Sequence, residues 1–355
     1  MTWNRAQGER GAGTAAARGA GAARDGRFVE VACDESGSDG ENLTGGNTDV
    51  FAHAGVRLPM DTAAECLREI RDRIRSPAEE YKANHLLREK HRAVLEWLLD
   101  ASGPIHGRSH VHLTEKAYFV VDRAVGLLLG DDDSDDAVTL FRAGPGTFGA
   151  ERWREFLAVS NRLLRVRGSE GDPPVDAFFR TVDGLWRAHP GTEAADVLRR
   201  LAAARPRADA YRARVEDTPD LIPLLNPLPP AVVRTAAYWS AGGATVNLVH
   251  DRQNLLTPER IAWIEESARR EGIALGGLRL VESRLDARVQ IADFLAGIAR
   301  KIASDELGGR GDATLTALLR PYVGAESVWG DPDSWSRLGP AAENAVRAVD
   351  INTGV

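Results

Sequence analysis

The stretch FVEVACDESG (residues 28–37) begins as a run of apolar and β-branched residues and ends in two neighbouring acids, Asp34 and Glu35. A second stretch, TVNLVHD (residues 245–251), has the same pattern and ends at Asp251. Runs of this kind predict buried strands. Acids at the carboxyl ends of neighbouring strands converge at the edge of a sheet, where open α/β sheets bind their ligands. We therefore expect an α/β fold that brings acids from both strands together.

Strand geometry chooses between the two neighbouring acids. Successive side chains of a strand point to opposite faces, so only one of Asp34 and Glu35 can share a face with groups on one side of the sheet. We favour Asp34 and keep Glu35 as a possible additional residue.

A third acid, Asp293, lies within a predicted amphipathic helix over residues 287–307. Asp is a poor residue for a helix interior, which makes this position notable. Helical spacing places Asp286, Gln290, Asp293 and Gly297 on one face, and the glycine permits close approach of another backbone. This face is suited to docking on the site at the sheet edge, with Asp286 and Gln290 as possible contributors.

Each acid also has a structural interpretation. Asp251 precedes a helix start at Thr257, so it is equally compatible with a turn or a helix cap. Asp286 fits the N-cap of the helix that follows it. A buried Asp293 could be neutralised by an arginine instead of a metal ion, because an unpaired buried carboxylate is costly. The three acids together favour a common site over three separate explanations.

Convergent carboxylates point to a divalent cation. They cannot all remain ionised at short distance unless a cation neutralises them, and oxygen ligands favour Mg²⁺ or Mn²⁺. Such ions orient a water nucleophile and stabilise a departing oxygen in phosphodiester hydrolysis. The sequence therefore predicts Asp34, Asp251 and Asp293 as metal ligands and catalytic residues. No organic cofactor is expected.

Three segments together resemble a known family: DESG (residues 34–37), EEYK (residues 79–82) and QIAD (residues 290–293). Their order and approximate placement are similar to those of the domain-of-unknown-function 3800 family, over about residues 28–307. The resemblance implies an RNase H-like fold and a metal-dependent nuclease. It also implies that Asp34 and Asp293 are metal ligands and that Lys82, with Glu79 or Glu80, lines the site. Lys82 would bind the scissile phosphate as a point charge, although a solvated lysine explains it equally well.

On this reading the fold class is α/β, an RNase H-like mixed sheet flanked by helices, with an inserted helical subdomain and a helical C-terminal extension. Apolar periodicity and proline breaks define the boundaries. The predicted parts are a Gly/Ala/Arg-rich tail, the first part of the RNase H-like domain, a helical insert, the second part of that domain and the extension: residues 1–26, 27–136, 137–230, 231–308 and 309–355.

Composition narrows the class of protein. The net charge of −7 argues against a protein that coats nucleic acid, but an enzyme needs only a local basic surface. The two cysteines, Cys33 and Cys66, have no Cys or His nearby at the spacing of metal ligands, and we predict that both are buried thiols. No apolar run suits a membrane span or the h-region of a secretory signal, so we expect a cytoplasmic protein without membrane contact.

Two other patterns carry less weight. His110 and His112 share a side of a predicted strand but have no third zinc ligand nearby in sequence. The Gly-rich segment at residues 144–149 lacks the lysine of a P-loop, and we predict a loop there.

Three functions remain open on the sequence alone. They are a metal-dependent nuclease with DNA or RNA as substrate, a non-catalytic nucleic-acid or protein-binding module on the same fold, and a metal-dependent hydrolase of a small phosphate or nucleotide substrate. Geometry separates them, because both catalytic alternatives require the acids to converge. The pattern identifies no protein partner.

Overall fold

The computed structural model describes residues 28–75, 82–130, 134–166, 172–217 and 223–341. Its centre is a five-stranded mixed sheet in the order β3-β2-β1-β4-β5. The first three strands are antiparallel neighbours, whereas β4 runs parallel to both β1 and β5. The strands are β1 (Phe28–Ser36), β2 (Val50–Val56), β3 (Ser109–Glu115), β4 (Thr245–Asp251) and β5 (Leu275–Val281).

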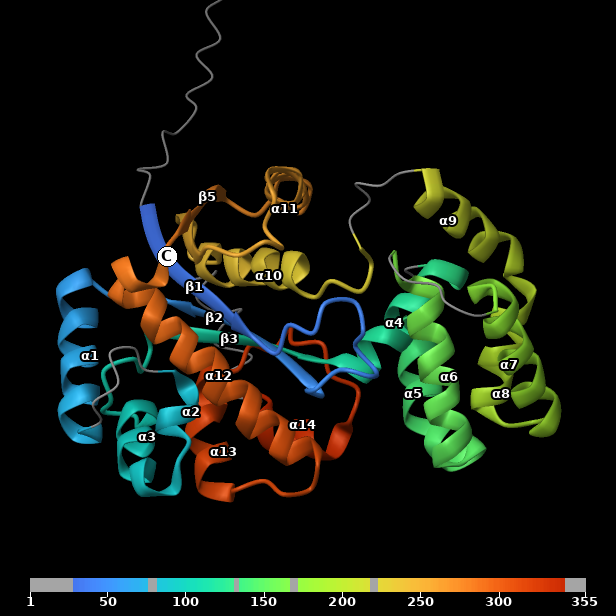
Figure 1. The fold of residues 1–355 in the computed structure, drawn as a ribbon, viewed down its shortest axis with the longest axis horizontal. Helices are drawn as coiled ribbons and strands as arrows, with labels where there is room; N and C mark the ends of the chain where they lie inside the picture. The colour runs from blue at the N-terminus through green and yellow to red at the C-terminus, as the bar shows by residue number, and fades with distance from the viewer. Residues whose placement is uncertain (1–27, 76–81, 131–133, 167–171, 218–222, 342–355) are drawn as a thin grey trace, which may run out of the picture.

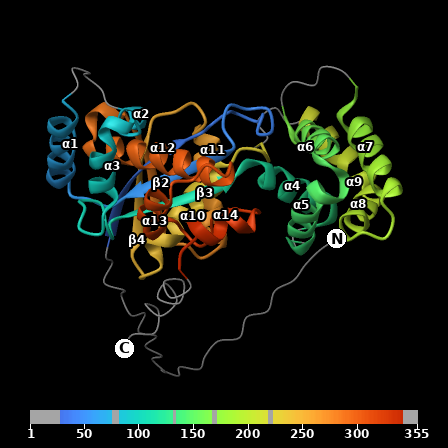
Figure 2. The same ribbon diagram turned by 90° about the horizontal axis from the view of Figure 1, so that it is seen from below.

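Helices cover both faces of this sheet (Figure 1). One face packs against α12 (Ala287–Leu307), which crosses β1 and β2. Around it lie α1 (Met60–Ile74), α2 (Ala83–Leu86), α3 (Arg92–Leu99), α13 (Ala313–Leu319) and α14 (Pro332–Leu338). Figure 2 shows this layer from below. The opposite face packs against α10 (Leu228–Ser240), with α11 (Pro258–Arg270) beside it.

A separate group of helices stands beside the sheet and has its own apolar core. Its members are α4 (Lys116–Leu129), α5 (Ser134–Phe148), α6 (Ala150–Leu164), α7 (Pro174–Ala188), α8 (Glu193–Ala203) and α9 (Arg205–Asp217). Aromatic residues fill this core, with Trp153 and Phe156 stacked at 5.1 Å between ring centroids. These aromatics pack against each other, as expected for an apolar helical core.

One buried polar side chain ties the helical group to the sheet. Asn161 of α6 accepts hydrogen bonds from the backbone N–H groups of Leu43 (2.8 Å) and Thr44 (3.1 Å). Its own amide donates to the backbone oxygen of Glu41 at 2.8 Å. These residues belong to the connection between β1 and β2, so α6 holds the loop that leaves the end of β1.

The sheet and the long helix agree with the sequence prediction, since a mixed α/β arrangement is present and the helix spans residues 287–307. Two local predictions were wrong. The apolar residues between 86 and 99 have a helical spacing that predicts one helix, but the segment is divided into α2, a 3₁₀ turn (Glu89–His91) and α3. The predicted loop at residues 144–149 lies mostly inside α5, where Gly144 lets the ring of Trp153 pack directly on the helix backbone.

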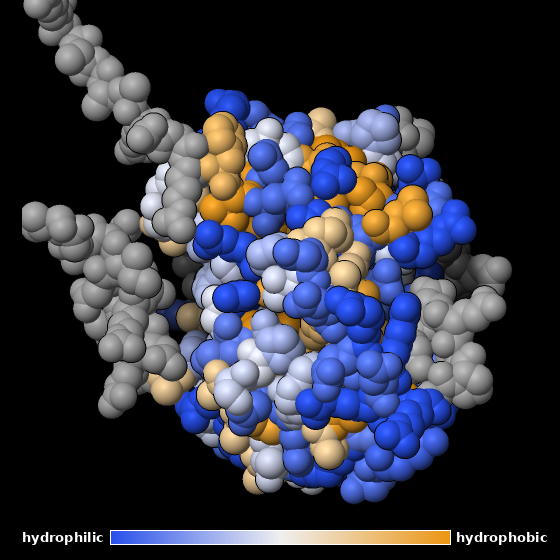
Figure 3. Space-filling view, turned by 90° about the vertical axis from the view of Figure 1, so that its left-hand side faces the viewer, coloured by the Kyte–Doolittle hydropathy of each residue, from blue (hydrophilic) through white to orange (hydrophobic). Residues whose placement is uncertain are grey.

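Apolar side chains gather between the layers, whereas the end of the molecule that carries α1 is largely hydrophilic (Figure 3). Within the described ranges, no helix combines the length and the apolar character needed to cross a bilayer.

Candidate functional site

The carboxyl end of β1 places Asp34 on the face of the sheet that α12 covers. Cys33 pairs with His250 across the parallel β1–β4 ladder. Because paired residues share a face and neighbours alternate, Asp34 and Asp251 lie together on the opposite face. Asp34 is 8% exposed, and one of its carboxylate oxygens accepts from the backbone N–H of Glu35 at 2.8 Å. The fold therefore brings these two acids to the same end of the sheet.

Burial and neighbouring charges act on the same acids. Burial raises the pKa of Asp34 well above its ordinary value, and the charges of Glu35, Asp293 and Asp251 raise it further. Burial, and then the charge of Asp251, raises the pKa of Glu35 to about 7. Carboxylates influence each other in this way only when they are close in space. Four acids from three separate segments thus form one electrostatically coupled cluster, and Glu35 belongs to it.

Asp293 reaches this cluster from α12, together with Lys82, the residue directly before α2. The Nζ atom of Lys82 lies 3.5 Å from a carboxylate oxygen of Asp293, and the two side chains are 53% and 22% exposed. Close packing of the two helices allows this contact, because a Cβ atom on Gly297 would lie 2.3 Å from the Cβ of Ala83. The lysine is thus placed at the open side of the cluster.

Asp251 is also held by the backbone. One of its carboxylate oxygens accepts from the N–H of Ser283 at 2.9 Å, at the start of the 3₁₀ turn Ser283–Leu285. This contact connects the ends of β4 and β5. Asp251 therefore both stabilises this turn and belongs to the cluster of acids.

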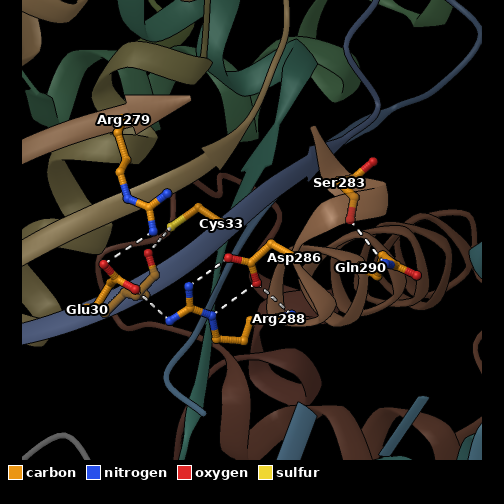
Figure 4. Close-up of polar contacts among 8 residues, drawn as sticks. Glu30, Cys33, Arg279, Ser283, Asp286, Arg288 and Gln290 are labelled. Atoms are coloured by element: carbon orange, nitrogen blue, oxygen red, sulfur yellow. Dashed lines mark hydrogen bonds and ion pairs between the residues drawn. The ribbon is translucent and has the colours of Figure 1, made fainter. Parts of the chain in front are cut away.

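Asp286 and Gln290 are engaged in structural contacts (Figure 4). Asp286 caps α12 by accepting from the N–H of Arg288, and its other oxygen pairs with the same guanidinium at 2.6 Å. Arg288 also pairs with Glu30 of β1 at 2.6 Å. Gln290 donates to the backbone oxygen of Ser283 at 3.1 Å. These bonds anchor the start of α12, and they account for Asp286 and Gln290 without a catalytic role.

The remaining candidates, Glu79 and Glu80, lie outside the residues that the structure describes.

A divalent cation would find the right donor chemistry here but not a closed ligand set. Oxygen ligands of the carboxylate type suit Mg²⁺ and Mn²⁺. One carboxylate oxygen of Glu35, Oε2, is buried and accepts no hydrogen bond. Yet among the described residues no three His, Cys, Asp or Glu side chains are arranged to hold a metal ion. The carboxylates are thus the type of ligand that the cation prefers, but to bind it their side chains would have to move closer to one another.

Comparison with protein-family models, with curated proteins and with solved structures found no match.

Sequence reasoning noted His110 and His112 but missed that they belong to a layer of four buried histidines behind the cluster. His53, His110, His112 and His250 come from three strands and are at most 2% exposed. The rings of His53 and His250 stack at 5.3 Å. Burial lowers the pKa of His250 to about 4, so its imidazole is neutral at neutral pH. They were not recognised as one group because each strand contributes only one or two of them, and the sequence does not show which strands are neighbours.

The contact between this layer and the acids runs through Glu35. The Nδ1 atom of His250 lies 2.9 Å from the backbone oxygen of Asp251, which can only accept, so Nδ1 carries the proton. The unprotonated Nε2 then faces Glu35 Oε2 at 3.6 Å. Two acceptors meet there, which favours the protonated form of Glu35, consistent with its raised pKa.

Arg300 is a second omission. Its Nε donates to the hydroxyl of Ser36 at 3.0 Å, directly after the acids of β1. Arg300 lies seven residues after Asp293, with Gly297 between them, and therefore shares their helix face. The sequence analysis would have found Arg300 if it had followed this helix face for one more turn beyond Gly297.

Proposed function

We propose that this chain is a divalent-metal-dependent nuclease with an RNase H-like fold, which hydrolyses phosphodiester bonds at the cluster of Asp34, Asp251 and Asp293. The observation that carries the proposal is the gathering of acids from β1, β4 and α12 around the buried Asp34, whose pKa is raised by burial first and then by the charges of Glu35, Asp293 and Asp251. The mixed sheet with acids at the ends of parallel β1 and β4 supports the fold assignment. The resemblance to the domain-of-unknown-function 3800 family is part of this proposal.

Each residue has a defined task. Asp34, Asp251 and Asp293 would hold Mg²⁺ or Mn²⁺, which when bound activates water and stabilises a departing oxygen. The ammonium group of Lys82, half-exposed beside Asp293, binds a non-bridging oxygen of the scissile phosphate. Arg300 holds the hydroxyl of Ser36 and so fixes the chain where it leaves the acids. Nucleic acid, DNA or RNA, is the proposed substrate.

A second candidate is a nucleic-acid-binding module that keeps this fold without catalysis. The absence of a closed ligand set among the described residues favours it. A bound phosphate would then pair with Lys82, and the acids would serve only the packing of α12. Metal-dependent hydrolysis of a small phosphate ester remains the third alternative, and it needs the same metal site.

Cleavage assays with matched variants separate these functions. Purified protein is incubated with single- and double-stranded DNA and RNA, and with a small phosphodiester, in Mg²⁺, Mn²⁺ or EDTA. We expect metal-dependent cleavage of a nucleic acid that Asp34→Asn and Asp293→Asn each reduce by at least about a hundredfold. Asp305→Asn is the control, because Asp305 lies on the same helix and pairs with Lys301.

Binding of the metal is measured separately by calorimetry with Mg²⁺ and Mn²⁺ in the absence of substrate. Cleavage that persists in both aspartate variants would reject this site. Nucleic-acid binding without metal binding or cleavage would favour the binding module, and activity on the small ester alone would favour the third alternative.

A further inference from the structure

A pocket lies between the β1–β2 connection and the end of α6. Asn42, Thr44 and Gly45 line it on one side, and Asn161, Arg162 and Arg165 on the other. Its volume is about 280 Å³. This is at the lower limit of pockets for drug-sized ligands, about 300 to 1,000 Å³, so it suits a small group. One side of the pocket is formed by the loop that follows the acids of β1.

Two arginines, Arg162 and Arg165, line this pocket. Arg162 lies in the last turn of α6, and Arg165 follows the helix directly. Their Nε atoms are buried and make no hydrogen bond within the described structure. An unpartnered buried charged donor is costly, and such costs are accepted where a ligand completes the bonding. Two arginines on one pocket, each with an Nε that has no partner among the described residues, point to an anion.

The remaining lining agrees with this charge. No Asp or Glu is among the described residues that line the pocket. Glu41, the nearest acid in the loop, accepts from the backbone N–H of Val166 at 2.9 Å. Asn161 uses its oxygen and its amide on the loop backbone, so it fixes the shape of the pocket. The arginines are thus the cations that a ligand here would meet.

We propose that this pocket binds a phosphate group through Arg162 and Arg165. The planar guanidinium fork matches the oxygens of phosphate in a bidentate manner. Two sources have this chemistry, the backbone of a nucleic acid and a free phosphate or phosphorylated small molecule. The site is distinct from the acids of β1, and it requires neither a metal ion nor cleavage.

Binding measured in EDTA tests the site independently of any nuclease activity. Calorimetry uses inorganic phosphate, and fluorescence anisotropy uses a labelled single-stranded oligonucleotide at several salt concentrations. The variants are Arg162→Gln/Arg165→Gln and the charge-retaining Arg162→Lys/Arg165→Lys. Arg152→Gln is the control, because Arg152 is exposed on the same helix outside the pocket. Circular dichroism reports whether each variant folds.

We expect wild-type protein and Arg152→Gln to bind inorganic phosphate equally well. The glutamine variant should bind it at least about tenfold more weakly, because hydrogen bonds between charged groups are lost. The lysine variant, which keeps both charges but not the fork, should lie between them. It also provides the measurement if the glutamine variant does not fold.

The oligonucleotide identifies the source of the phosphate. The nucleic-acid backbone is supported if the glutamine variant binds the oligonucleotide more weakly than wild-type protein does. The slope of the logarithm of the binding constant against the logarithm of the salt concentration should then fall in magnitude by about one for each arginine removed. Unchanged oligonucleotide binding with lost phosphate binding supports a free phosphate or a phosphorylated small molecule. The proposal is overturned if wild-type protein binds no phosphate, or if Arg152→Gln weakens binding as much as the pocket variants do.

Discussion

Replacing Glu35 by Gln should stabilise the protein at neutral and alkaline pH. Burial and the charge of Asp251 raise the pKa of Glu35 from its ordinary value of 4.5 to about 7. The folded state thus keeps a proton that the unfolded state releases. This contribution to stability is complete below pH 4.5 and is lost as the pH rises through about 7. Glutamine has the same shape and cannot ionise, so it avoids the loss.

The size of the effect follows from the same pKa. Each pKa unit corresponds to about 1.4 kcal/mol, so the change at Glu35 is worth up to about 3 kcal/mol above pH 7. Asp34 titrates together with Glu35, and part of this free energy is therefore shared by the pair. For a chain of 355 residues, 3 kcal/mol corresponds to about 4 °C in Tm.

Urea denaturation followed by circular dichroism, in EDTA from about pH 4 to pH 8, measures the difference. The free energy of unfolding of Glu35→Gln should exceed that of wild-type protein increasingly as the pH rises. Glu216→Gln is the control, because Glu216 is exposed on α9. Parallel pH profiles for wild-type protein and Glu35→Gln would refute the proposed origin of the raised pKa. Added Mg²⁺ should stabilise wild-type protein most at high pH, where the acids are ionised.

Three further substitutions test the packing around the site. Gly297→Ala should cost about 1 to 3 kcal/mol in urea denaturation, because the new Cβ would lie 2.3 Å from that of Ala83, and wild-type stability would disprove this close contact. Lys116→Met should cost about 3 kcal/mol, since it leaves the partly buried carboxylate of Asp39 with the hydrogen bonds from Thr48 but without its cationic partner; an unchanged urea midpoint would contradict this. Asn161→Ala should speed hydrogen exchange of the two loop amides that it binds, while the amides of β2 exchange as before.

The sequence predicted those parts of the fold that depend on local periodicity. The strand ending at Asp34, the strand ending at Asp251 and the helix over residues 287–307 each carry a clear pattern of apolar residues. Alternation along β1 also assigned Asp34 to the face shared with Asp251. The same alternation gave Glu35 only a secondary role, because it does not take into account that a side chain at the end of a strand can reach neighbours on both faces.

Other features depend on contacts between distant segments, which no local pattern reveals. The apolar run at Leu228–Ser240 lies beside a proline-rich stretch and was not recognised as α10, the helix whose Thr235 and Tyr238 contact His53 and His110. The pairing of Arg288 in α12 with Glu30 in β1 likewise joins two segments that are far apart in the sequence. That the Nε atoms of Arg162 and Arg165 have no partner among the described residues can be known only from the folded structure.

The order of the strands bears on how the chain folds as it leaves the ribosome. The antiparallel strands β1, β2 and β3 emerge first, with one edge of β1 unpaired. Its partner, β4, is synthesised only after the whole helical group, which can collapse around its own aromatic core in the meantime. An exposed strand edge invites pairing with another chain. The nascent protein therefore passes through a stage at which aggregation competes with completion of the sheet.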